Sequence, residues 1–176
     1  AMKQYELDWT YVDAVYFVMA TLSTVGYGDL SPSTGNARLI TLGIMFIGVF
    51  MVFPIVATTI GGLVAPITSK GRTLLDRLVP PQTIDIDGDG SKDYPIPGPA
   101  FIYYSKRLLP SVLLVVIVQL LSAWAFVFFE APSWTFDDAL YHCLVTVTTV
   151  GYGDVYIATQ WGRIFASMHM VLGVVL

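Results

Sequence analysis

The stretch TVGYGD at residues 24–29 decides the fold of this chain, and it returns unchanged at residues 149–154. A shift of 125 residues brings the two copies into register. The same shift places Trp9 on Trp134, Asp13 on Asp138 and Arg38 on Arg163 without a gap. Because chance does not hold register over such a length, the sequence predicts one unit used twice: a short amphipathic helix, a glycine loop and a spanning helix.

The glycines of these loops indicate an unusual backbone. Gly26 and Gly28 can adopt positive φ, which lets successive carbonyl oxygens point to the same side of the strand. We expect the Thr24 hydroxyl to lie below these carbonyls, and Val25 and Tyr27 to turn outward against the surrounding helices. A glycine turn between two core helices is the alternative, but two in-register copies that each enter a long apolar segment disfavour it.

The composition is that of a membrane protein. Hydrophobic residues make up 55% of the 176 residues and charged residues 12%, whereas charged residues are about a quarter of an ordinary soluble domain. Three apolar stretches, near residues 38–64, 108–129 and 163–176, are expected to enter the bilayer as full or partial helices. The sequence therefore predicts a multi-pass integral membrane protein.

We predict three segments along the chain. Residues 1–64 hold the first loop and its inner helix, residues 65–107 form a proline-punctuated linker, and residues 108–176 hold an outer helix, the second loop and a truncated inner helix. Six of the nine basic residues lie in the linker: Lys70, Arg72, Arg77, Lys92, Lys106 and Arg107. The positive-inside rule then predicts a cytosolic linker, with both loops on the extracellular or luminal side.

Residues 21–29 (TLSTVGYGD) and 146–154 (TVTTVGYGD) resemble the pore loops of potassium channels. Two such loops in one chain resemble the two-pore-domain potassium channel family. The resemblance implies an all-α integral membrane fold with a tandem repeat of pore helix, filter loop and inner helix. It also implies a pseudo-fourfold pore formed by a homodimer, which conducts potassium passively because backbone carbonyls replace the water around the ion.

The resemblance assigns roles residue by residue. The carbonyls that would bind potassium ions belong to Thr24, Val25, Gly26, Tyr27, Thr149, Val150, Gly151 and Tyr152. Filter support and the outer mouth would involve Gly28, Asp29, Gly153, Asp154 and His142. Residues 9–23 and 134–148 would be pore helices, whose C-terminal dipoles favour a cation.

The resemblance also implies an outer helix before each pore loop, and none precedes Trp9. We therefore expect a piece of a longer chain rather than a channel in which one outer helix is dispensable. A fungal-type channel, with more helices before the same two loops, remains an alternative interpretation.

His142 carries a separate hypothesis. The resemblance places its position close to the outer aspartate, so we hypothesise that His142 hydrogen-bonds Asp154 and makes the pore acid-sensitive, because histidine titrates near neutrality. A histidine that packs against its neighbours without a gating role is the alternative.

Two further features of the sequence each have a functional and a structural interpretation. Gly48 and Gly173 share one repeat position and are candidate hinges, and Pro54 is expected to kink only the first inner helix. Close packing between membrane helices explains the same glycines equally well. Asp85, Asp87 and Asp89 match the first half of a calcium-binding EF-hand loop, but Ile96 stands where a glutamate should close it. We therefore favour a solvated acidic turn over a calcium site.

The sequence thus favours a potassium channel, with membrane lipid and a second copy of the chain as partners and potassium ions in the filter. A non-conducting scaffold or a transporter subunit is the second hypothesis, which the two intact glycine-tyrosine-glycine runs disfavour. No enzymatic site is expected, because the sequence has no clustered metal ligands, no nucleophile with a base and no phosphate-binding loop. Neither nucleic acid nor a small-molecule substrate is expected to bind.

Overall fold

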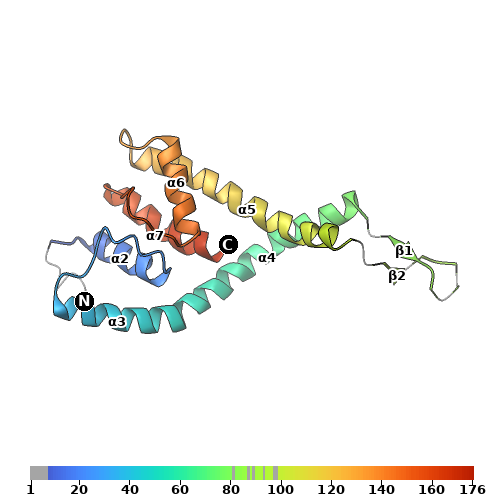
Figure 1. Ribbon diagram of the computed structural model, residues 1–176, viewed down its shortest axis with the longest axis horizontal. Coiled ribbons are helices and arrows are strands. Elements are labelled where there is room, and N and C mark those ends of the chain that lie inside the picture. Colours follow the sequence, from blue (N-terminus) through green and yellow to red (C-terminus); the bar gives the residue numbers. More distant parts are fainter. Residues whose placement is uncertain (1–7, 81, 87, 89, 93, 97–98) are drawn as a thin grey trace. The chain divides into compact units, whose positions relative to one another are not determined.

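The computed structural model describes residues 8–80, 82–86, 88, 90–92, 94–96 and 99–176, most of which are helical (Figure 1). In chain order the elements are α2 (Tyr11–Leu22), α3 (Gly35–Ile47), η1 (Gly48–Val52), α4 (Phe53–Leu78), β1 (Thr83–Ile84), β2 (Tyr94–Pro95), α5 (Ala100–Phe129), α6 (Phe136–Val147) and α7 (Gln160–Val175). The chain divides into two compact units, Ala1–Gly61 with Ile117–Leu176, and Gly62–Val116.

Two helical stretches are long and apolar enough to cross a membrane. One is the continuous run α3–η1–α4, Gly35–Leu78, and the other is α5, Ala100–Phe129. Most of their apolar side chains are exposed, among them Phe50, Ile55 and Leu121. Because a helix satisfies its own backbone hydrogen bonds, such a surface is suited to contact with lipid tails.

Both long helices continue into the segment that was predicted to be a linker. Helix α4 ends at Leu78 rather than near Val64, and α5 begins at Ala100 rather than Leu108. The predicted ends followed the change from apolar to polar residues. Helix formation instead follows backbone propensity, and the leucine, lysine and arginine residues of this region are good helix formers.

A π-helical turn, η1, interrupts the first long helix immediately before Pro54. The N–H of Phe53 bonds to the Gly48 carbonyl, five residues back. In a regular α-helix the ring of Pro54 would clash with the carbonyl of residue 50, and the wider turn relieves that clash. The expected distortion at Pro54 is therefore a π turn, whereas α7 is a regular α-helix.

The core of the first unit lies where α2, α5, α6 and α7 meet. Its largest buried side chains are those of Tyr16, Phe126, Ile157 and Met170. The Phe126 ring meets the rings of His142, Phe165 and His169 edge-on, at centroid distances of 5.1, 4.9 and 5.5 Å. Aromatic burial at the end of α5 therefore positions α6 and α7.

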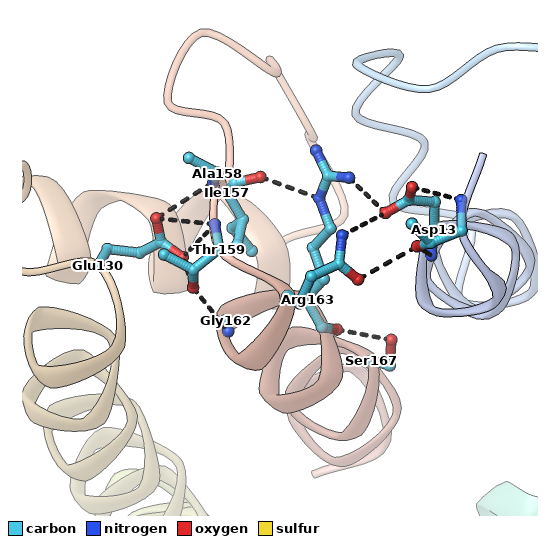
Figure 2. Close-up of polar contacts among 10 residues, drawn as sticks. Asp13, Glu130, Ile157, Ala158, Thr159, Gly162, Arg163 and Ser167 are labelled. Atoms are coloured by element: carbon cyan, nitrogen blue, oxygen red, sulfur yellow. Dashed lines mark hydrogen bonds and ion pairs between the residues drawn. The ribbon is translucent and has the colours of Figure 1, made fainter. Parts of the chain in front are cut away.

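The buried carboxylate of Glu130 ties the end of α5 to the start of α7 (Figure 2). It accepts hydrogen bonds from the backbone N–H groups of Ala158 and Thr159, each at 3.1 Å, and from the Thr159 hydroxyl at 2.6 Å. The same hydroxyl oxygen accepts from the N–H of Gly162 at 2.9 Å and so caps α7. An added Cβ at Gly162 would overlap the Glu130 carboxylate, so glycine is required there by space.

The second unit contains the end of α4, a short hairpin and the start of α5. Strands β1 and β2 pair antiparallel, with Ile84 opposite Tyr94. Lys106 of α5 forms an ion pair with Asp76 of α4 at 3.2 Å. The two helix ends are therefore joined by charge as well as by the hairpin.

The acidic turn of this hairpin uses its first aspartate to bind backbone. The Asp85 carboxylate accepts from the N–H groups of Gly88 and Gly90, at 2.7 and 3.0 Å. Both glycines have positive φ, 74° and 86°. Asp87 and Asp89, the other two candidate calcium ligands, lie outside the described residues.

Removing the Glu130 carboxylate should destabilise the protein. E130A leaves two partly buried N–H groups and a hydroxyl without their acceptor, so we expect a loss of about 2 kcal/mol in the free energy of unfolding. Tryptophan fluorescence of the purified protein during thermal unfolding measures this. D8A removes an exposed carboxylate and should change stability by less than about 0.5 kcal/mol. Equal melting of E130A and D8A would contradict the assigned role.

Candidate functional site

The two glycine loops, residues 24–29 and 149–154, each follow a helix that is capped in the same way. Thr10 caps α2, and its hydroxyl oxygen accepts from the Asp13 N–H at 3.1 Å while the Asp13 carboxylate accepts from the Thr10 N–H at 2.8 Å. Thr135 and Asp138 form the same capping box on α6. The last turn of neither helix contains a basic residue, so the negative end of each helix dipole faces its loop without compensation.

The backbone of both loops is left-handed at every second residue. In the first loop φ is +60° at Thr24, +59° at Gly26 and +81° at Gly28. In the second loop φ is +55° at Thr149, +54° at Gly151 and +71° at Gly153. The expectation that glycine supplies positive φ is confirmed. The threonines were missed, because a β-branched residue rarely adopts positive φ.

The N–H groups of the loops bond back to the helix ends that precede them. The Gly26 N–H donates to the Ala20 carbonyl at 3.0 Å. In the second loop the Val150 and Gly151 N–H groups both donate to the Val145 carbonyl, at 3.1 and 3.2 Å. These bonds hold the strained backbone in place from the helix side.

The first loop turns its valine and tyrosine into the protein core. Val25 and Tyr27 are 3% and 7% exposed. The Tyr27 ring stacks on His142 of α6, with centroids 5.1 Å apart, and on Tyr16 of α2 at 6.1 Å. Its hydroxyl also contacts the Thr146 hydroxyl. Both side chains therefore pack against the surrounding helices, as expected. Helix α6, which covers Tyr27, belongs to the second half of the chain.

His142 lies beside the first loop. The expected hydrogen bond from His142 to Asp154 is not formed, because both ring nitrogens bind other groups. Its Nδ1 donates to the Val155 carbonyl at 3.2 Å, and its Nε2 accepts from the Tyr27 hydroxyl at 3.2 Å. The Asp154 carboxylate instead accepts from the hydroxyl of Tyr141 at 2.9 Å. Neighbouring helix positions point about 100° apart, so Tyr141 faces the aspartate and His142 faces the core.

A polar network joins α2 to the start of α7 (Figure 2). The Arg163 guanidinium forms an ion pair with Asp13, and its Nε donates to the Ile157 carbonyl at 3.0 Å. Its Cζ lies 5.8 Å from the centroid of the Tyr16 ring. Gln160 donates to the same Asp13 carboxylate at 3.2 Å. Residues 150 positions apart therefore fix α2, the helix that precedes the first loop, against α7.

The charge of Asp13 is secured by this network. Burial favours the neutral acid, but hydrogen bonds from Thr10 and Arg163 outweigh that effect and lower the pKa of Asp13 to about 2. In the sequence, Asp13 and Arg163 stand out only as aligned positions of the repeat. The threonine-x-x-aspartate capping pattern before each loop was a signal for the helix start, but nothing local indicates the arginine partner.

The candidate hinge glycines differ in their surroundings. An added Cβ at Gly48 would overlap the end of the Leu22 side chain on α2, so a larger residue there would require Leu22 to move. At Gly173 an added Cβ would be in ordinary contact with Gln119, at 3.5 Å. A hinge role for either glycine, or for Pro54 beside the π turn, stays a prediction.

Known proteins resemble most of this chain. A family model described as an ion channel matches residues 2–73 and 114–176. The chain is 29% identical over 164 residues to two pore potassium channel b of Oryza sativa subsp. japonica, covering 93% of this chain and 42% of that protein. It is 28% identical over 165 residues to two-pore potassium channel 4 of Arabidopsis thaliana, covering 94% and 54%. The resemblance inferred from the loops is confirmed, and the chain spans about half the length of these relatives.

The surroundings of His142 predict a specific pH dependence of stability. Burial lowers the pKa of His142 to about 4, while an unfolded histidine titrates near 6.5. The folded state therefore keeps the neutral ring, and its stability falls as the pH drops from about 6.5 toward 4, by at most about 1.4 kcal/mol per pH unit.

Unfolding free energies of wild-type protein and H142F, measured from pH 8 to 4, test this expectation. H142F should have a smaller slope below pH 6.5, and His169 stays in both proteins as a common background. Parallel curves for the two proteins would show that His142 does not contribute to the slope.

Proposed function

The chain belongs to the ion channel family, and from this premise we propose that it is the pore-forming part of a potassium-selective channel. The observation that carries the proposal is the left-handed φ at residues 24, 26 and 28 and again at 149, 151 and 153. Alternation of this kind turns successive carbonyl oxygens to one side. No enzymatic activity is proposed.

The carbonyls supply what a potassium ion needs when it leaves water. The ion-binding oxygens we propose are those of Thr24, Val25, Gly26, Tyr27, Thr149, Val150, Gly151 and Tyr152. Stacked rings of such oxygens replace the hydration shell of the ion, with four loops contributing to each ring. One chain has two loops, so we propose that a homodimer encloses one pore.

The helix ends favour a cation on the inner side of the loops. Helices α2 and α6 end immediately before the loops, and no basic residue lies in the last turn of either. The partial negative charge at a helix C-terminus attracts a cation within the first turn or so. Both helices therefore favour potassium electrostatically without binding it.

Acidic side chains mark the outer end of each loop. Asp29 and Asp154 follow Gly28 and Gly153, and each has a tyrosine from the preceding helix as a partner, Tyr16 and Tyr141 respectively. Carboxylates held at a pore mouth raise the local concentration of cations. We propose this role for the two aspartates, with His142 supporting the first loop through Tyr27.

We propose that the long apolar helices hold this pore in a lipid bilayer. Exposed apolar side chains of Gly35–Leu78 and Ala100–Phe129, such as those of Phe50 and Leu121, would contact lipid. The basic residues of the hairpin unit would lie on the cytosolic side, as the positive-inside rule favours. The loop mouths would then open to the extracellular or luminal side.

Alanine in the first loop should reduce potassium selectivity. G26A meets no atom within 4 Å, but the position has a φ of +59°, which costs an alanine about 1–2 kcal/mol. Relaxation of that strain would turn a carbonyl away from the pore. The reversal potential of the reconstituted full-length protein, recorded between potassium and sodium solutions, should move toward zero.

A matched control is G35A in the first turn of α3, where the added methyl also meets open space but φ is helical. It should keep the wild-type reversal potential. A wild-type protein that passes sodium as readily as potassium would refute the proposed selectivity. A wild-type protein that passes neither ion would favour a non-conducting scaffold.

A further inference from the structure

The two glycine loops share one backbone conformation, but different surroundings cover their side chains. Val25 and Tyr27 are 3% and 7% exposed, whereas Val150 and Tyr152, at the same repeat positions, are 48% and 68% exposed. The cover of Tyr27 is α6, through His142 and Thr146. The repeat places Phe17 and Thr21 of α2 at the positions of this cover. In a single chain, however, Phe17 is buried with Trp9 and Ala37, and Tyr152 is exposed.

The charged network at the start of α7 is complete, whereas only part of the equivalent network forms at the start of α3. Arg163 bonds the Ile157 carbonyl through Nε and pairs with Asp13 over the Tyr16 ring. Arg38 bonds the Pro32 carbonyl through Nε at 3.2 Å, at the equivalent repeat position. Its guanidinium is exposed, and among the described residues it is in no ion pair.

The other half of the equivalent network lies on α6. Asp138 caps its own helix as Asp13 does, but no cation pairs with it among the described residues. Tyr141 corresponds to Tyr16, and it is 39% exposed where Tyr16 is 1% exposed. Asp138 and Tyr141 therefore present an anion and an aromatic ring without the arginine that the first repeat receives.

The apolar faces follow the same pattern. On α7, Ile164, Ser167 and Val171 line a cavity together with residues of α2. Their repeat equivalents on α3 are Leu39, Leu42 and Phe46, which are 67%, 54% and 69% exposed. The face of α3 that corresponds to the α2-contacting face of α7 is thus apolar and uncovered in the single chain.

We infer that Arg38 pairs with Asp138 of a second copy of the chain, with its guanidinium over the ring of Tyr141 in that copy. This inference rests on the proposed function, because a pore of four loops needs two chains. Within a chain, Asp13 of the first repeat pairs with Arg163 of the second repeat. Between chains, Asp138 of the second repeat would pair in the same way with Arg38 of the partner subunit. Such head-to-tail contacts close into a ring after four repeats, so each dimer has two Arg38–Asp138 pairs.

Charge and burial both favour this occupant over solvent or lipid headgroups. The intrachain pair joins a guanidinium and a carboxylate that are 17% and 8% exposed, and the proposed pair would have the same partners in the same order. Partly buried arginine–carboxylate pairs fix orientation, since the planar guanidinium offers donors in a rigid fork. The pair would therefore set the register between the two chains.

Cysteine crosslinking between separately tagged chains tests the inference. Full-length R38C and D138C, each without other reactive cysteines, are co-expressed and treated with a short bismaleimide. We expect a crosslinked dimer that contains both tags, and no such product from either variant expressed alone. The matched control is D13C with R163C in one chain, which should be crosslinked within the monomer and not between chains.

Charge reversal gives a second readout. R38D and D138R should each lower the dimeric fraction measured by mass photometry in detergent, and the two changes together should restore it. The inference would be overturned if D13C and R163C are crosslinked but R38C and D138C give no product. It would also be overturned if the double charge reversal does not restore dimers. If the wild-type protein is dimeric and potassium-selective in these cases, only the ion pair is refuted. A monomeric wild-type protein would refute the proposed pore as well.

Discussion

A potassium ion gives up its water only where other oxygen atoms already stand in the positions that the water leaves. Backbone carbonyls can meet that demand when the chain is held in a conformation that most residues avoid, and both loops have such a backbone at every second residue. Strain of this kind persists only if the surroundings fix it. The helix ends fix it from one side through bonds such as that from Gly26 to Ala20. In the first loop, the packing of Tyr27 fixes the backbone from the other side.

The support of the first loop comes from the opposite end of the chain. Arg163 binds Asp13, and His142 binds Tyr27, so the second half of the molecule holds the first loop in place. The second loop has the same backbone but less cover, as the exposure of Tyr152 indicates. A structure in which one half stabilises the other suits a ring of repeats, because each repeat both gives and receives the same contact.

The longer helices and their ends serve this arrangement. Glu130 holds the start of α7 by binding the backbone of Ala158 and Thr159, and so keeps Arg163 in position. On the first long helix, the π turn at Gly48–Val52 lets the chain pass Pro54 while Gly48 packs against Leu22. The surfaces that remain apolar and exposed suit a bilayer, which is the solvent that such helices require.

The sequence by itself determined the membrane class, the two loops, their glycines at positive φ and their family resemblance. These follow from properties of single residues and of short stretches: hydropathy, the missing Cβ of glycine, and a register that repeats. The tertiary structure alone decided the left-handed threonines, the partners of His142 and Asp154, and the role of Glu130. It also decided the pairing of Arg163 with Asp13. Each of these depends on groups that are distant in the chain, and no local pattern records which distant group arrives.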